Sequence, residues 1–154
     1  MNTIEQNLQQ HNLTLPEAAA PVANYVPYSI SGKRVFISGQ LPMQDGKPAV
    51  LGKLGEYINL EEGVEAAKLC ALNLLAQLKA ACGGDLSKIA RCIRLGIFVN
   101  STDDFTDQPK VANGASDVMV QALGDAGKHC RAAVGVNTLP LGVAVEVEGI
   151  FEVV

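Results

Sequence analysis

The chain has 154 residues, of which 48% are hydrophobic, and it carries a net charge of −4 with a pI near 5.1. This length suits one ordinary domain with a real core, and the apolar content excludes a disordered chain. With only 12 Lys and Arg residues, the protein lacks the basic face that tight non-specific binding to nucleic acid requires, so we expect no nucleic-acid partner.

The N-terminal segment 1–21 has neither the cationic region nor the apolar stretch of a signal peptide. No window approaches the roughly 18 apolar residues that a membrane span needs. We therefore expect a cytoplasmic protein without a membrane partner. The four cysteines, Cys70, Cys82, Cys92 and Cys130, form no CxxC pair. With only two histidines beside them, the sequence predicts neither a metal site nor a disulfide framework.

The first third of the chain predicts a short helix, a linker and a hairpin. Residues 3–12 have Ile4 and Leu8 at helical spacing, and the PEAAAP stretch that follows is a linker. The SGKR sequence at 31–34 separates two β-rich runs, which predicts a β-hairpin. Residues 43–58 are punctuated by glycines and predict a loop.

Two long helices and a strand are predicted next. Asn59 and Glu62 have the spacing of a capping box, and apolar residues then recur on one helical face up to Gly83 and Gly84. A strand is expected from 89 to 99. A second helix is expected to start near Asp107, a candidate cap, and to end near Gly127.

The C-terminal segment predicts two strands around a Leu-Pro turn, with Arg131 at the head of the first and Glu146 and Glu148 within the second. The order of elements indicates an α+β fold, with a mixed β-sheet and two long helices on one of its faces. The other face stays partly uncovered although its strands carry valine and isoleucine. An exposed apolar face of this size is typical of oligomers.

Three segments resemble the YjgF or Rid family of reactive intermediate deaminases, whose older name is endoribonuclease L-PSP. They are SGQLP at 38–42, FVNSTDDF at 98–105 and CRAAVGVNTLPLGVAVEVEGIFEV at 130–153. The VANGASD run at 111–117 is typical of a distinct branch. The resemblance covers roughly residues 16–154. We expect a single domain of this kind over residues 1–154, in which 1–20 form an N-terminal helix and linker. The resemblance also implies a chorismate-mutase-like fold and a homotrimer with a central barrel.

The family hydrolyses enamine and imine intermediates, such as 2-iminoacids, to ketoacids and ammonia without a cofactor, in clefts between subunits. The resemblance implies that Arg131 binds the carboxylate of a small ligand and that Glu146 helps to orient or deprotonate water. We favour Glu146 over Glu148 for this role by register alone. The other residues that the resemblance places in the cleft are Tyr25, Ser38, Gly39, Asn113 and Ala133.

Ala133 departs from the family, because many relatives have a cysteine there. A mechanism in which this position acts through its backbone N–H and C=O groups tolerates alanine. The sequence leaves two alternatives open for Arg131, which is either a carboxylate clamp or an interface arginine paired with an acid. Deamination is the favoured function. The alternatives are a non-catalytic binding protein for small carboxylates and a ribonuclease or translation inhibitor.

Overall fold

A computed structural model describes residues 3–21 and 24–154 of the chain. The helices and strands are, in chain order, α1 (Thr3–Gln10), β1 (Tyr28–Ser31), β2 (Arg34–Gln40), β3 (Met43–Gln44), β4 (Lys47–Pro48), α2 (Leu60–Ala81), β5 (Ile89–Asn100), α3 (Gln108–Leu123), β6 (Cys130–Val136) and β7 (Val145–Val153). Short 3₁₀ turns, at Leu86–Lys88, Gly124–Gly127 and Pro140–Gly142, precede β5, β6 and β7.

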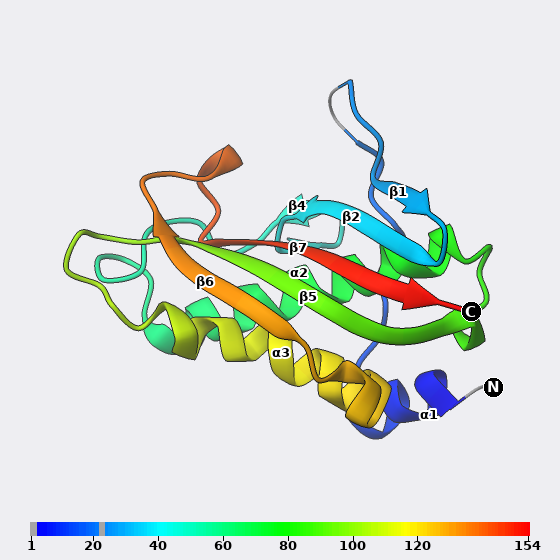
Figure 1. The fold of residues 1–154 in the computed structure, drawn as a ribbon. Coiled ribbons are helices and arrows are strands. Elements are labelled where there is room, and N and C mark those ends of the chain that lie inside the picture. The colour runs from blue at the N-terminus through cyan, green and yellow to red at the C-terminus, as the bar shows by residue number, and fades with distance from the viewer. Residues whose placement is uncertain (1–2, 22–23) are drawn as a thin grey trace.

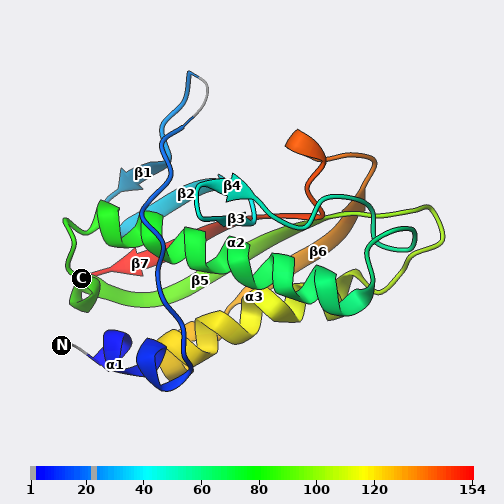
Figure 2. The same cartoon turned by 180° about the vertical axis from the view of Figure 1, so that it is seen from behind.

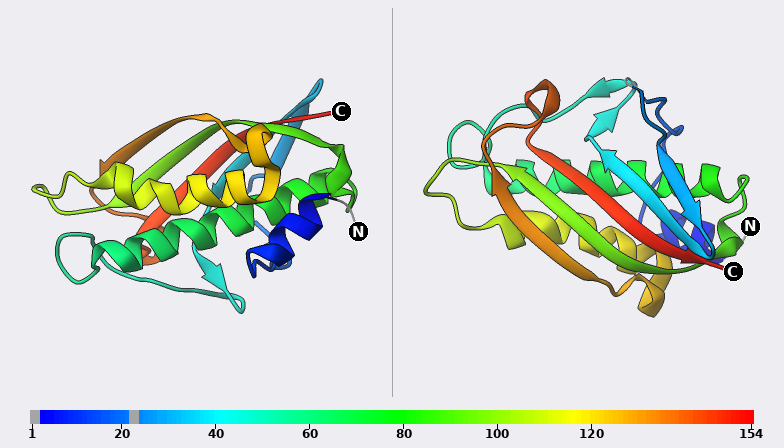
Figure 3. Two further views of the ribbon diagram at one scale, coloured as in Figure 1. Left: turned by 90° about the horizontal axis from the view of Figure 1, so that it is seen from below. Right: turned by 45° about the horizontal axis from the view of Figure 1, so that its top comes forward.

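One five-stranded sheet has the order β1-β2-β7-β5-β6 (Figure 1). Strands β5 and β6 are parallel, because α3 carries the chain back across the sheet between them, and all other neighbours in this sheet are antiparallel. Helices α2 and α3 lie on the same face, and none of the described helices covers the other face (Figures 2 and 3). The predicted α+β class and the placement of both long helices on one face are confirmed.

Helix α2 begins and ends as its sequence predicts. The side chain of Asn59 accepts a hydrogen bond from the backbone of Glu62, and the Glu62 side chain accepts one from the backbone of Asn59. At the other end, Gly83 and Gly84 adopt positive φ angles. Their N–H groups bond back to carbonyls of the last turn, with a 2.9 Å bond from Gly84 to Lys79, as in a Schellman motif.

Some boundaries differ from those expected. Helix α1 ends at Gln10, and the 43–58 loop contains a small hairpin of β3 and β4. Helix α3 ends at Leu123, and Gly127 instead ends a 3₁₀ turn that follows it. Asp107 stands at the N-cap position of α3 but makes no capping bond with its side chain. Its carboxylate lies 3.6 Å from the Lys110 ammonium, which is a local alternative to capping.

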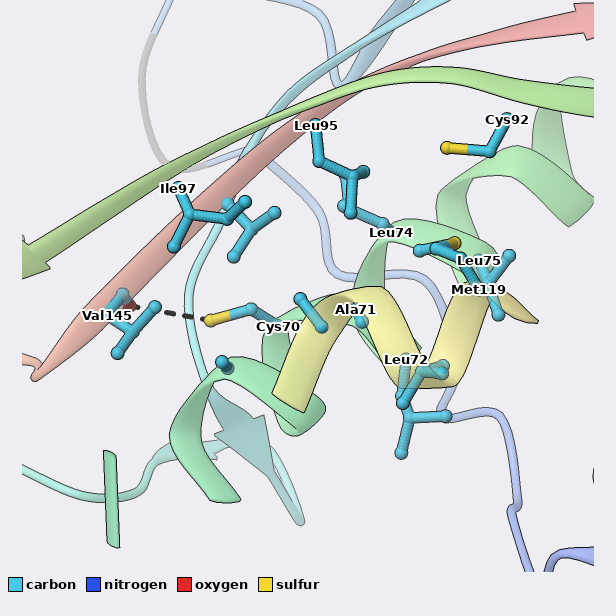
Figure 4. Packing of buried hydrophobic residues seen from close by; sticks show 14 of the residues in the cluster. Cys70, Ala71, Leu72, Leu74, Leu75, Cys92, Leu95, Ile97, Met119 and Val145 are labelled. Atoms are coloured by element: carbon cyan, nitrogen blue, oxygen red, sulfur yellow. Dashed lines mark hydrogen bonds between the residues drawn. The ribbon is translucent and has the colours of Figure 1, made fainter. Parts of the chain in front are cut away.

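The core lies between the helices and the sheet (Figure 4). Leu74 and Leu75 of α2 and Leu95 of β5 are fully buried there. The Cys70 thiol donates a 3.4 Å hydrogen bond to the carbonyl of Val145. Burial raises the pKa of this thiol well above its ordinary value, so the sulfur is a packing group of the α2–β7 contact.

The uncovered face of the sheet mixes apolar and acidic side chains. Phe36 and Val134 are 43% and 46% exposed. Glu146 and Glu148 lie on the same face, since Glu146 pairs with Phe98 and Phe98 with Val134 across the sheet. No helix in the described part of the chain is long and apolar enough to span a bilayer.

Candidate functional site

Arg131 lies on the helix side of the edge strand β6. It pairs with Leu95 across the sheet, and Leu95 is buried on the side that faces α2 and α3. Helix α3 holds the guanidinium through three hydrogen bonds. Its Nη1 donates to Asn113 Oδ1 at 2.9 Å and to Ser116 Oγ at 2.9 Å, and its Nη2 donates to the Pro109 carbonyl at 3.1 Å. The side chain therefore has a defined orientation although it is exposed.

These bonds leave a specific part of the guanidinium available. An arginine has five N–H donors, and the described contacts use both hydrogens of Nη1 and one of Nη2. The Nε–H and the second Nη2–H of Arg131 remain. Two donors are what one carboxylate accepts in a bidentate pair. Helix α3 thus holds one edge of the Arg131 guanidinium, and the remaining N–H donors can bind one planar anion.

The positive charge of Arg131 has no acidic partner within the described chain. The ion pairs there are Arg91 with Glu152 at 3.7 Å, Lys110 with Asp107 at 3.6 Å, and Lys128 with Asp125 at 3.0 Å. All three partners of Arg131 are neutral oxygens. The described part of the chain therefore supplies no acid that neutralises Arg131. Its anion comes from outside the chain, as a ligand carboxylate or as an acid of another subunit.

The sequence did not single out Ser116 and His129, yet both belong to this cluster. Ser116 Oγ lies 2.9 Å from Nε2 of His129, and Nδ1 of the same ring lies 2.6 Å from the Gly127 carbonyl. His129 precedes Arg131 by two residues, on the same side of the extended chain. That spacing, together with a serine one helical turn after Asn113, is the only sequence signal that could have found them.

Glu146 lies on the opposite, uncovered side of the sheet and packs against Gly39. A Cβ atom added at Gly39 would come within 2.7 Å of Glu146 Oε1, so glycine gives the carboxyl group room. Gly39 lies in a β-bulge, because three steps from Ile37 to Gln40 match only two steps on β7. Because Gly39 has no side chain and lies in a bulge, the carboxyl group of Glu146 packs directly on the backbone of β2.

The two acids of β7 have different surroundings. Desolvation, and in second place the charge of Glu148, raises the pKa of Glu146 above its ordinary value. The Glu148 side chain instead lies over Gly96, together with Nη1 of Arg94. Glu148 therefore shares its site with a cation, whereas Glu146 is a partly desolvated carboxyl group beside a second acid.

Tyr25 and Gly39 both line a pocket of about 120 Å³, whose other walls include Leu41 and Leu141. Tyr25 is 48% exposed at its rim. Ser38 donates from Oγ to the Val26 carbonyl at 2.8 Å, which ties β2 to the segment before β1. The Ser38 hydroxyl hydrogen is therefore in use, and the oxygen lone pairs are what it can offer a ligand.

Ala133 lies two residues beyond Arg131 on the same side of β6 and pairs with Ile97. It is half-buried against the core. Because β6 is an edge strand, alternate backbone N–H and C=O groups along it point away from β5. The strand therefore supplies backbone groups near Arg131 without a reactive side chain at position 133.

One chain does not bring all the predicted site residues together. Arg131, Asn113 and Ala133 form one group on the helix side of the sheet edge. Glu146, Gly39, Ser38 and Tyr25 form a second group on β2, β7 and the segment before β1, and β5 separates the two (Figure 1). Among the described residues, no group of three or more His, Cys, Asp and Glu side chains is arranged to hold a metal ion.

The fold is that of a small α+β protein of the chorismate-mutase-like class. A family model described as "YjgF/chorismate mutase-like, putative endoribonuclease" matches residues 5–152, and the chain belongs to this family. Protein TCP17 of Trypanosoma cruzi is 46% identical over 150 residues, which are 97% of this chain and 93% of TCP17.

Two solved structures share the whole fold. The protein Atu1372 of Agrobacterium tumefaciens, described as of unknown function, is 48% identical with a TM-score of 0.93, over 99% of this chain and 93% of that one. A protein of Shewanella oneidensis described as "a putative endoribonuclease" is 39% identical with a TM-score of 0.94, over 99% of this chain and 100% of that one. Both similarities extend over the segments that carry the two groups of residues described above.

Proposed function

We propose that the protein hydrolyses small 2-iminoacids and their enamine tautomers to 2-ketoacids and ammonia, at clefts between the subunits of a homotrimer. The observation that carries this proposal is Arg131, a guanidinium with no acidic partner among the described residues, held from behind and with two N–H donors left over. Such a group fits a small carboxylate in a bidentate pair.

Once Arg131 holds the carboxylate of the substrate, the hydrolysis needs few further groups from the protein. Arg131 holds the substrate so that its iminium carbon faces a water molecule, and Glu146 accepts a proton from that water as the C–O bond forms. Glu146 then passes this proton to the nitrogen of the carbinolamine. As the C–N bond breaks and ammonia leaves, Glu146 takes the hydroxyl proton, so that the C=O bond of the ketoacid forms; ammonia then carries this proton away as ammonium. An iminium carbon is already electrophilic, so positioning and one proton acceptor suffice, and no cofactor is required.

The raised pKa of Glu146 supports its part in this reaction. A carboxyl group whose pKa is raised by burial and a nearby acid is a stronger base when ionised than an ordinary glutamate. Glu148, which lies beside Arg94, lacks this setting. This supports the choice of Glu146 over Glu148.

Within one chain Arg131 and Glu146 lie on opposite sides of the sheet, so we propose that they meet only when subunits assemble into a trimer. The uncovered sheet face carries Phe36, Phe98, Val134 and Ile150 beside its acids, and burying such a face is a common reason for oligomerisation. We propose that three sheets close into a barrel through this face, so that the edge strand β6 of one subunit adjoins the Glu146 region of its neighbour. We place this activity in the cytoplasm, since the sequence has no disulfide framework.

Ammonia release from freshly generated 2-iminoacids tests the proposal. We expect the protein to accelerate their conversion to 2-ketoacids, and Arg131→Ala to abolish the acceleration. If the wild-type protein binds 2-ketoacids but does not accelerate hydrolysis, it is a carboxylate-binding protein and the catalytic proposal is wrong.

The family description also raises a ribonuclease function. The net charge of −4 disfavours it, because phosphate backbones bind basic surfaces. Binding to a single-stranded RNA, measured at two salt concentrations, separates this candidate from the first. Tight and salt-dependent binding would favour the ribonuclease.

A further inference from the structure

A chain of hydrogen bonds connects Arg131 to the backbone at Gly127, and it takes no part in the proposed reaction. It passes from Arg131 Nη1 to Ser116 Oγ at 2.9 Å, from Ser116 Oγ to His129 Nε2 at 2.9 Å, and from His129 Nδ1 to the Gly127 carbonyl at 2.6 Å. Ser116 lies on α3, and His129 lies between the 3₁₀ turn and β6. Both side chains are half-buried, so solvent reaches them only in part.

The direction of each bond follows from what its end groups can do. A guanidinium only donates and a backbone carbonyl only accepts. In neutral His129 the hydrogen must therefore lie on Nδ1, pointing to Gly127, and Nε2 must be the acceptor. The Ser116 hydroxyl then donates to Nε2 and presents an oxygen lone pair to Arg131. The whole chain has one consistent arrangement of hydrogens while the ring is neutral.

The anchor of this chain is tightly packed. A Cβ atom at Gly127 would lie 2.1 Å from the Met119 carbonyl of α3, so the backbone at 127 lies directly on that helix, and Gly127 is buried. Its carbonyl, which fixes the tautomer of His129, is therefore held by the fold itself. The histidine thus connects a rigid point of the backbone to the hydroxyl that contacts Arg131.

We propose that His129 is a positioning residue for Arg131, acting through Ser116. By occupying the Ser116 hydroxyl hydrogen, His129 keeps the serine oxygen turned toward Nη1. Asn113 Oδ1 accepts the other Nη1 hydrogen, so the guanidinium plane is fixed, while Nε and Nη2 each keep one N–H donor. That these donors bind a substrate carboxylate rests on the proposed function, whereas the positioning itself does not.

Calorimetry of pyruvate binding to the assembled protein, at about pH 8.5, tests the proposal. We expect Ser116→Ala to weaken binding by about 5- to 20-fold, because one Nη1 hydrogen loses its acceptor. His129→Leu should weaken it by about 3- to 10-fold. His129→Gln should restore most of this loss, because its amide oxygen can accept the serine hydrogen near the position of Nε2.

The double variant Ser116→Ala/His129→Leu is the decisive comparison. Because His129 acts only through Ser116, the double variant should bind pyruvate no more weakly than Ser116→Ala alone. If the two losses multiply, or if His129→Gln is as weak as His129→Leu, His129 is not acting through the serine and the proposal is wrong. Thermal unfolding of each variant identifies any that fails to fold.

A measurement without ligand separates this proposal from the proposed function. In ¹⁵N NMR spectra, a guanidinium held at Nη1 rotates slowly about its Nε–Cζ and Cζ–Nη bonds and gives resolved Nη signals. We expect resolved signals for Arg131 in the wild type and in His129→Gln, and averaged signals in His129→Leu. Resolved signals in His129→Leu would overturn the positioning role. Resolved signals in a wild-type protein that binds no carboxylate would support positioning while the proposed function fails.

Discussion

Arg131 and Glu146 lie on opposite sides of the same sheet, and their surroundings differ in kind. Neutral oxygens of one helix surround Arg131 and orient it without reducing its charge. Glu146 lies on bare backbone at Gly39, beside a second acid, and the pKa of its carboxyl group is raised. The first region is built to present a charge in a fixed direction. The second is built to make a carboxyl group easy to protonate.

Removing the charge of Arg131 should have the largest effect on the protein. Arg131→Ala should weaken 2-ketoacid binding by about 2–5 kcal/mol, because a bidentate charge-assisted contact is lost. Arg131→Lys should rescue little, since a point charge does not reproduce the planar pair of donors. Calorimetry measures the loss, and sedimentation of the same samples measures assembly. Loss of the trimer with normal binding in the remaining clefts would show that Arg131 is an interface residue.

Glu146 and Glu148 form a matched pair for the second region. Glu146→Gln should lower the rate of hydrolysis by about 10²- to 10⁴-fold, the usual contribution of a general base. Glu148→Gln should keep most of the rate, because its side chain lies beside Arg94. Equal losses in the two variants, measured with the same 2-iminoacid, would contradict the assignment of the base to Glu146.

The pH dependence of the hydrolysis rate should also distinguish Glu146 from Glu148. In the proposed reaction Glu146 acts as the carboxylate, so the rate should rise with pH through its pKa, which lies above the ordinary value for glutamate. The charge of Glu148 contributes to that shift, so in Glu148→Gln the rise should occur at lower pH. A profile measured from about pH 4 to pH 8 checks both points. An unmoved profile would mean that the two acids are not coupled.

The raised pKa also has a consequence for stability. A carboxyl group with a higher pKa in the folded state loses stability as pH rises from its unfolded to its folded pKa. Glu146→Gln should therefore stabilise the protein at pH 7 relative to wild type. The gain should be on the order of 0.5 kcal/mol, because solvent screens this half-exposed group. Urea unfolding at pH 4 and pH 7 measures it, and a gain at pH 4 alone would contradict the assigned direction.

The smallest effect is expected from the cysteines. Burial raises the pKa of Cys82 and Cys70, and that of Cys92 to about 12, so these thiols are poor nucleophiles. Cys130 is the exposed one. Iodoacetamide should therefore modify Cys130 first and leave the deamination rate unchanged. Loss of activity without unfolding would give a thiol a role in the chemistry.

Sequence periodicity and capping residues predicted the fold well, because they are local. Asn59, Glu62 and the glycines after α2 determine where that helix begins and ends, and the SGKR turn predicts its hairpin. The end of α3 was misplaced, because Gly124 and Gly127 are equally good stop signals and only packing against Met119 distinguishes them.

The site was less predictable, because its contacts join distant segments. Arg131 was visible as a charged residue at the head of an apolar strand, but its partners Ser116 and His129 lie on a helix and a turn that only the fold brings together. The contact of Glu146 with Gly39 depends on a bulge in β2 that the residue pattern of the strand does not predict. The opposite faces of Arg131 and Glu146 follow from a register across three strands, which the sequence of one strand does not contain.

In the proposed trimer each site combines Arg131 of one subunit with Glu146 of its neighbour, and mixing subunits tests this arrangement. Arg131→Ala and Glu146→Gln chains, each inactive alone, are unfolded together and reassembled in equal amounts. Random trimers should then contain about a quarter of clefts with both native residues, and so recover about a quarter of wild-type activity. A mixture of Arg131→Ala with the double variant is the control and should stay inactive. No recovery in the first mixture, in trimers verified by sedimentation, would contradict the shared site.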